Sequence, residues 1–225
     1  MAQDEAVEIV SEGLRPLADP IRAARMAAYL KTDMPFYGVS SADLAPVLKR
    51  LLSDIPVDDR STYTAVVETL WALPHREEKH LAIRYARSFP RFIDAASIAL
   101  FRRLIVEGAW WDLVDESAVR LVGRALRNDR VVVEPIVRSW IRDDDLWLRR
   151  TTIICQLAEK SGTDLALLED ACVANVGDSD FFIRKAIGWA LRQYARTDPE
   201  WVRSFVDTHR QEMSGLSVRE ATKYL

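Results

Sequence analysis

Trp111 and Asp115 stand four residues apart in the run WWDLVD, residues 110–115, a spacing that places an indole and a carboxylate one above the other on a helix. A carboxylate beside an aromatic face suits a cationic ligand. The residues also allow a second interpretation, in which Trp111 packs between helices and Asp115 pairs with a neighbouring arginine. Trp110 falls on the apolar face of the same helix and is expected in the core.

Arg150 lies within the apolar stripe of another expected helix. The stripe is formed by Leu146, Ile153, Ile154 and Leu157. An arginine in that position must meet a buried anion or face a groove that admits one. A phosphate is one natural partner, because the planar guanidinium binds it through two hydrogen bonds. An internal ion pair with a carboxylate at the edge of the core is the other.

Trp189 is surrounded by cations on the expected helix around residues 181–196. On a helical wheel it shares an arc with Gly188 and with Arg184, Lys185, Arg192 and Arg196. Gly188 leaves room for close approach, so this face suits a polyanion whose groups can also stack. The alternative is an indole that covers apolar surface among solvated charges. We expect these cations to share one concave surface with Arg149 and Arg150.

The composition sets limits on these interpretations. The chain has 225 residues, 49% of them hydrophobic, which predicts a globular protein with a sizeable core. The formal charge of −3 gives no support for nucleic-acid binding, so a DNA site must rest on a local patch. Cys155 and Cys172 are expected to be buried and reduced. No secretory signal and no membrane span are expected.

No motif for a cofactor or metal is found. Glycine-rich nucleotide loops and the G-x-S-x-G nucleophile motif do not occur. His75, His80 and His209 do not combine with the two distant cysteines into a zinc-like set. We therefore expect neither a cofactor nor a metal.

Helix signals run almost from end to end, and no strand is expected. Asp19–Pro20 and Asp198–Pro199 each place a capping residue before a proline that suits the first helical position. The segment from Asp145 (DLWLRRTTII) matches the segment from Asp180 (DFFIRKAIGW) at an offset of 35 residues. The same step back leads to Trp110 and then to His75. A period of roughly 33–47 residues is typical of two-helix solenoid repeats.

Five stretches resemble the DNA alkylation repair family, the HEAT-like-repeat glycosylases that excise 3-methyladenine and 7-methylguanine. They are FYGVSSADL (36–44), LWALPHREE (70–78), WWDLVD (110–115), LWLRRTTII (146–154) and FFIRKAIGWALRQYART (181–197). The resemblance extends from about residue 20 to the C-terminus. It implies an all-α, right-handed superhelical solenoid of HEAT-like two-helix repeats, which we expect as a single domain over residues 1–225.

The resemblance also implies roles for individual residues. Trp111, Asp115 and Trp189 match the family's catalytic pocket, and Arg150 and Arg192 match residues that hold the DNA backbone. Their neighbours Arg149, Arg184, Lys185 and Arg196 are expected to assist with the phosphates.

The expected reaction is hydrolysis of the N-glycosidic bond of cationic alkylated purines in duplex DNA. Alkylation gives the base a positive charge, so the enzyme needs an anion near the sugar more than an acid for the base, and Asp115 supplies it. We expect a cytoplasmic monomer, nucleoid-associated when engaged on DNA, with no membrane partner. The alternatives are a non-catalytic DNA-binding repeat protein for distorted or branched DNA and a protein-interaction scaffold.

Overall fold

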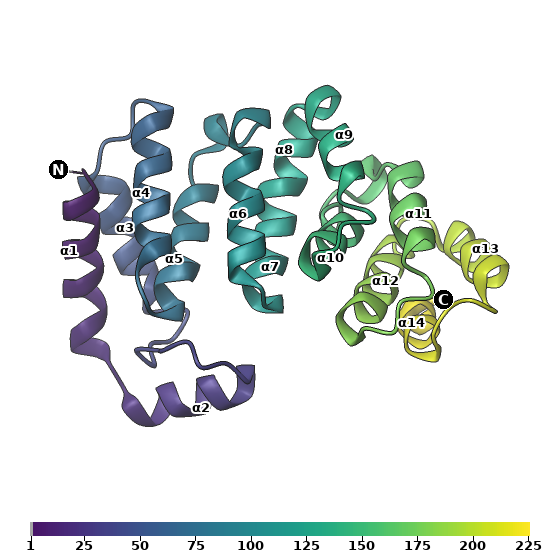
Figure 1. Ribbon diagram of the computed structural model, residues 1–225, viewed down its shortest axis with the longest axis horizontal. Helices are drawn as coiled ribbons and strands as arrows, with labels where there is room; N and C mark the ends of the chain where they lie inside the picture. The colour runs from purple at the N-terminus through teal and green to yellow at the C-terminus, as the bar shows by residue number, and fades with distance from the viewer. Residues whose placement is uncertain (1) are drawn as a thin grey trace. The chain divides into compact units, whose positions relative to one another are not determined.

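The computed structural model describes residues 2–225, and these residues form helices and no strands (Figure 1). The α-helices are α1 (Ala2–Leu14), α2 (Pro20–Leu30), α3 (Leu44–Asp54), α4 (Arg60–Ala72), α5 (Arg76–Arg87), α6 (Ile98–Gly108), α7 (Trp111–Ser117), α8 (Gly123–Asn128), α9 (Arg130–Ser139), α10 (Leu146–Ile154), α11 (Leu165–Ala174), α12 (Phe181–Tyr194), α13 (Pro199–His209) and α14 (Gly215–Ala221). Short 3₁₀ turns and one π-helical turn, η4 (Ala118–Val122), connect or interrupt them. The prediction of an all-α fold is confirmed.

The residues that precede one set of helices confirm the 35-residue period. His75, Trp110, Asp145 and Asp180 stand immediately before α5, α7, α10 and α12, at intervals of 35. Ser214 stands immediately before α14 and follows Asp180 by 34 residues, almost the same interval. Asp145 and Asp180 cap their helices in the same way, each accepting hydrogen bonds from the second and third backbone N–H groups that follow it.

A second series of aspartates precedes the partner helices of these repeats. Its members are Asp59, Asp94, Asp129, Asp164 and Asp198. All of them except Asp129 accept a backbone N–H at the start of the following helix. The sequence analysis recognised only Asp198 as a cap. The two series together define a unit of two helices that recurs about every 35 residues.

The chain divides into two compact units, one ending at Phe92 and the other spanning Ile93–Leu225. In the first unit α1 packs on α3 and α4, and α5 packs on the same two helices. This division reflects where contacts within the chain are dense, and it does not test the single domain expected from the sequence, which stays a prediction.

A buried carboxylate organises the first unit. Glu77, at the start of α5, accepts hydrogen bonds from the backbone N–H groups of Tyr37, Gly38 and Val39, at 3.1, 2.8 and 3.1 Å. Gly38 has a φ of +81°, and a Cβ there would lie 2.2 Å from the carbonyl oxygen of Asp19. The stretch FYGV therefore needs a glycine at this turn to pass so close to the chain before α2.

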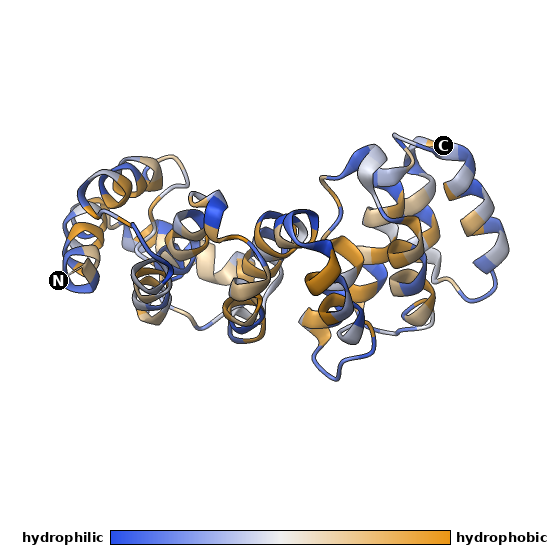
Figure 2. Cartoon of the chain, turned by 90° about the horizontal axis from the view of Figure 1, so that it is seen from above, coloured by the Kyte–Doolittle hydropathy of each residue, from blue (hydrophilic) through white to orange (hydrophobic). Residues whose placement is uncertain are grey.

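In the second unit the equivalent helices of successive repeats stack side by side in the order α7, α10, α12, α14. Asparagine side chains join one repeat to the next. Asn128 donates to the carbonyl of Ile93 and Asn175 to that of Ile141, at 2.8 and 3.0 Å. Figure 2 shows that hydrophobic and hydrophilic residues are interspersed along most of the helices. Cys155 and Cys172 are buried free thiols within this unit, as predicted.

The structure contains no helix, among residues 2–225, long and apolar enough to cross a membrane.

Candidate active site

Asp115 and Arg150 form a deeply buried ion pair in the second unit. Arg150 Nε donates to Asp115 Oδ1 at 2.7 Å, and Nη2 donates to Oδ2 at 2.8 Å. The arginine side chain is 4% exposed and the aspartate side chain 17%. This two-point geometry fixes the plane of the carboxylate and leaves part of it open to solvent.

The third nitrogen of the Arg150 guanidinium also has a protein partner. Nη1 donates to the backbone carbonyl of Phe182 at 2.6 Å, at the start of α12. Arg150 therefore ties α7 to α12 through α10. Of the two partners that the sequence left open for Arg150, a carboxylate and a phosphate, this structure shows the carboxylate. For Asp115, the structure shows the second interpretation that the sequence allowed, in which this carboxylate pairs with a neighbouring arginine.

Burial raises the pKa of the Asp115 carboxyl above its ordinary value of 3.8, while the hydrogen bonds and charge of Arg150 oppose that shift. The nearby Asp112 carboxylate adds to the rise. Arg150 thus holds a charged carboxylate in surroundings that would otherwise favour the neutral acid.

An aromatic cluster contacts this pair through Phe182, whose ring centre lies 6.0 Å from the central carbon of the Arg150 guanidinium. Trp110, Trp147 and Phe182 form a cluster with ring centroids 5.0–6.0 Å apart. The core position expected for Trp110 is corrected: it stands in extended conformation just before α7 and is only half-buried in this cluster. Trp111 is half-buried one helical turn before Asp115. Successive repeats thus supply the rings of this cluster, which meets the ion pair at Arg150.

A left-handed turn sets the position of these tryptophans. Ala109, the residue that follows α6, has φ 38° and ψ 33°, a conformation that usually selects glycine or asparagine. The chain then becomes extended at Trp110 and enters α7 at Trp111.

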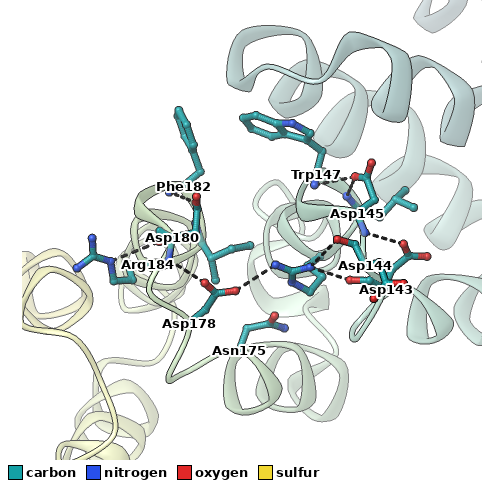
Figure 3. Close-up of polar contacts among 12 residues, drawn as sticks. Asp143, Asp144, Asp145, Trp147, Asn175, Asp178, Asp180, Phe182 and Arg184 are labelled. Carbon is teal, nitrogen blue, oxygen red and sulfur yellow. Dashed lines mark hydrogen bonds and ion pairs between the residues drawn. The ribbon is translucent and has the colours of Figure 1, made fainter.

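The loops before α10 and α12 repeat the same aspartate pattern (Figure 3). The backbone N–H of Asp145 donates to Asp143, and that of Asp180 donates to Asp178, at 2.9 and 2.8 Å. Arg149 joins these loops. It donates to the carbonyls of Asp143 and Asp144, and it pairs with Asp178 of the next repeat at 3.2 Å.

The cations of α12 also contact other protein groups. Lys185 and Arg192 both pair with Glu220 of α14, with a Lys185 Nζ to Glu220 Oε1 distance of 2.7 Å. Arg184 Nε donates to the carbonyl of Asp180 at 3.4 Å. The Arg196 guanidinium lies 5.1 Å from the ring centre of Tyr224.

Trp189 is half-buried on α12, next to Gly188. Gly188 does allow a close approach, as expected, but the group that approaches is α14. A Cβ on Gly188 would lie 2.4 Å from Glu220 Cβ and 2.9 Å from the carbonyl oxygen of Ser217. The expectation that this space admits an external ligand is therefore corrected: α14 fills it.

The structure thus pairs Asp115 with Arg150 at α7, the helix that the WWD tryptophans begin. The other predicted site residues lie on or next to the neighbouring helices: Arg149 on α10, Arg184, Lys185, Trp189 and Arg192 on α12, and Arg196 just after α12. Roles for these residues in DNA binding and catalysis stay predictions. The sequence analysis missed Glu220 and the Phe182 carbonyl. Over residues 2–225 no group of three or more His, Cys, Asp or Glu side chains could hold a metal ion.

Comparison with known proteins identifies the class. The family model described as DNA alkylation repair enzyme matches residues 10–225, so the chain belongs to that family. No curated protein matches it in sequence.

Among solved structures, the chain is similar to a predicted DNA alkylation repair enzyme from Enterococcus faecalis. The TM-score is 0.85 at 29% identity, and the match covers 92% of this chain and 96% of that one. The helical repeat fold and the link to DNA alkylation repair rest on both comparisons.

Proposed function

We propose that this protein is a DNA glycosylase that hydrolyses the N-glycosidic bond of cationic alkylated purines, such as 3-methyladenine and 7-methylguanine, in duplex DNA. The observation that carries the proposal is the two-point ion pair of Asp115 with Arg150, which holds a partly exposed carboxylate one helical turn from Trp111. The family membership supports DNA as the substrate.

Asp115 acts on the sugar. Alkylation at N3 or N7 makes the purine a good leaving group, so bond cleavage builds positive charge on the deoxyribose. A fixed carboxylate stabilises that charge and orients the attacking water. Because Arg150 uses both carboxylate oxygens, it holds Asp115 in place before the substrate arrives. Arg150 is therefore a positioning residue in this mechanism, and a direct phosphate contact by it is not required.

Trp111 and Trp189 contact the cationic nucleotide through their rings, each contributing about 0.5–2 kcal/mol. Arg149, Arg184, Lys185, Arg192 and Arg196 hold the phosphates, which positions the duplex without reading its sequence. The reaction needs no metal or cofactor, and the protein acts as a cytoplasmic monomer.

The test incubates the protein with duplex DNA that carries 7-methylguanine and measures free base and abasic sites. Release of the base by the wild-type protein supports a glycosylase. Duplex binding without release indicates the non-catalytic DNA-binding alternative. The absence of both indicates a scaffold and overturns the proposal.

A further inference from the structure

Glu220 places one carboxylate between two cations of α12. Its Oε1 pairs with Lys185 Nζ at 2.7 Å, and its Oε2 pairs with Arg192 Nη1. The two cations lie seven residues apart on α12, so they project from the same side of the helix, two turns from one another. Glu220 thus bridges Lys185 and Arg192, and these three side chains form one charged strip along α12.

Gly188, midway between the two cations, makes this bridge possible. Its missing side chain lets the Cβ of Glu220 come within 2.4 Å of where a Cβ would stand. The buried Ser217 fixes the approach of α14 by donating through Oγ to the carbonyl of Arg184 at 3.0 Å. The backbone of α14 is therefore held in place, and the Glu220 carboxylate lies two bonds beyond the Cβ that approaches Gly188.

The carboxylate is charged at neutral pH. Lys185, through its hydrogen bond, and Arg192 hold the pKa of Glu220 below its ordinary value of 4.5, against the opposing effect of burial. Two cations and one anion leave this strip with a single net positive charge. A bridging carboxylate and a bridging phosphate both offer two oxygens to such a lysine and arginine.

We infer that Glu220 occupies the place of a DNA backbone phosphate between Lys185 and Arg192 in the free protein, and that a bound duplex displaces it. This inference rests on the proposed function, because it concerns the phosphate contacts of the same DNA. It assigns to Glu220 the role of an internal competitor that weakens binding to duplex DNA. Lys185 and Arg192 become available to phosphates only when the carboxylate turns away.

The experiment compares Glu220→Gln with the wild type and with Glu200→Gln. Glu200 lies on the neighbouring α13, is largely exposed and pairs with Arg203, so it provides the same change of charge away from α12. Duplex affinity is measured by fluorescence anisotropy over a range of salt. We expect Glu220→Gln to bind about 3–10-fold more tightly near 0.1 M salt, with a log–log salt slope steeper by about one unit. Glu200→Gln should give a smaller gain and an unchanged slope.

The double variant Arg192→Ala/Glu220→Gln separates competition from a general charge effect, because it should lose the extra affinity and the extra slope. A gain no larger than that of Glu200→Gln, or weaker binding, would overturn the inference. Weaker binding would mean that Glu220 orients the two cations for the phosphate. Melting curves of each preparation establish that α14 is still in place.

Two further measurements keep the inference testable whatever the variants or the duplex do. Elution from immobilised heparin uses a polyanion without bases, and Glu220→Gln should elute at higher salt than both the wild type and Glu200→Gln. If the variant does not fold, the NMR signal of reductively methylated Lys185 in the wild type should shift on addition of heparin. If Glu220→Gln does not elute at higher salt and the Lys185 signal does not shift, the inference is refuted and the glycosylase proposal is unaffected. An absence of excision by the wild type refutes the glycosylase proposal instead.

Discussion

Asp115 and Arg150 are 35 residues apart and occupy the same position in successive repeats, where their side chains form a two-point ion pair. Lys185 and Glu220 have the same separation and also form an ion pair. All four residues lie at about the same distance from the start of their helices, near the second turn of α7, α10, α12 and α14. The repeat period thus brings these two pairs of charged groups together across neighbouring helices.

Replacing Gly188 by alanine should destabilise the protein by about 1–3 kcal/mol, because the new methyl group would overlap Glu220 and the Ser217 carbonyl. Gly177→Ala is the matched control, since nothing lies within 4 Å of a Cβ at that position. Chemical denaturation of both variants checks the prediction. Equal stabilities would show that α12 and α14 are less tightly packed than described.

The sequence predicts much of this arrangement. The match between the segments from Asp145 and Asp180 gave the period, and the apolar stripe around Arg150 gave the need for a buried anion. The two together could have identified Asp115 as that anion, because it lies one period earlier. Asp59, Asp94, Asp129 and Asp164 follow the same period, but the residues around them differ from repeat to repeat, so the apolar pattern does not reveal them.

Other parts of the site could not be predicted in this way. The carbonyl of Phe182 has no sequence signature as an acceptor, since every residue has such a group. Gly188 indicated a close approach, but the sequence does not say whether a ligand or another helix approaches. Only the packing of α14 shows that Glu220 covers Lys185 and Arg192.

Arg192→Ala should weaken binding to lesion and undamaged duplexes alike, because phosphate contacts carry no information about the base. Each lost contact should flatten the dependence of log affinity on log salt by about one unit. Binding isotherms at several salt concentrations measure this slope. A change in lesion preference with an unaltered slope would contradict a role for Arg192 on the DNA backbone.

In the proposed mechanism the ionised form of Asp115 is the active one, so the excision rate should fall as the pH drops through the raised pKa of this carboxyl, above 3.8. Arg150→Gln leaves the effect of burial unopposed, which raises the Asp115 pKa further and moves the acid limb of the rate profile to higher pH. Single-turnover rates across pH test this.

Arg149→Gln is the control for that profile, since Arg149 lies next to Arg150 but pairs with Asp178. It should leave the acid limb where it is. If Arg150→Gln and Arg149→Gln give the same profile as the wild type, Arg150 does not act through the charge of Asp115.

The substrate preference should favour cationic lesions, such as 3-methyladenine and 7-methylguanine, over uncharged ones such as uracil and hypoxanthine. The sequence offers no candidate acid to protonate a neutral leaving base, so in the proposed mechanism the substrate brings its own charge. Competition between labelled duplexes measures the preference. Efficient release of uracil would contradict the mechanism.

The single-turnover excision rate of Asp115→Asn tests the catalytic role of the carboxylate most directly. The substitution keeps the size of the side chain and removes its charge. The rate should fall about 10²–10³-fold, equivalent to about 3–4 kcal/mol, while duplex binding changes little. Because Arg150 loses a charged partner, some loss of thermal stability is also expected, and a melting curve of the same preparation separates it from the loss of rate. Near-normal excision by a folded Asp115→Asn protein would show that Asp115 is only the structural partner of Arg150.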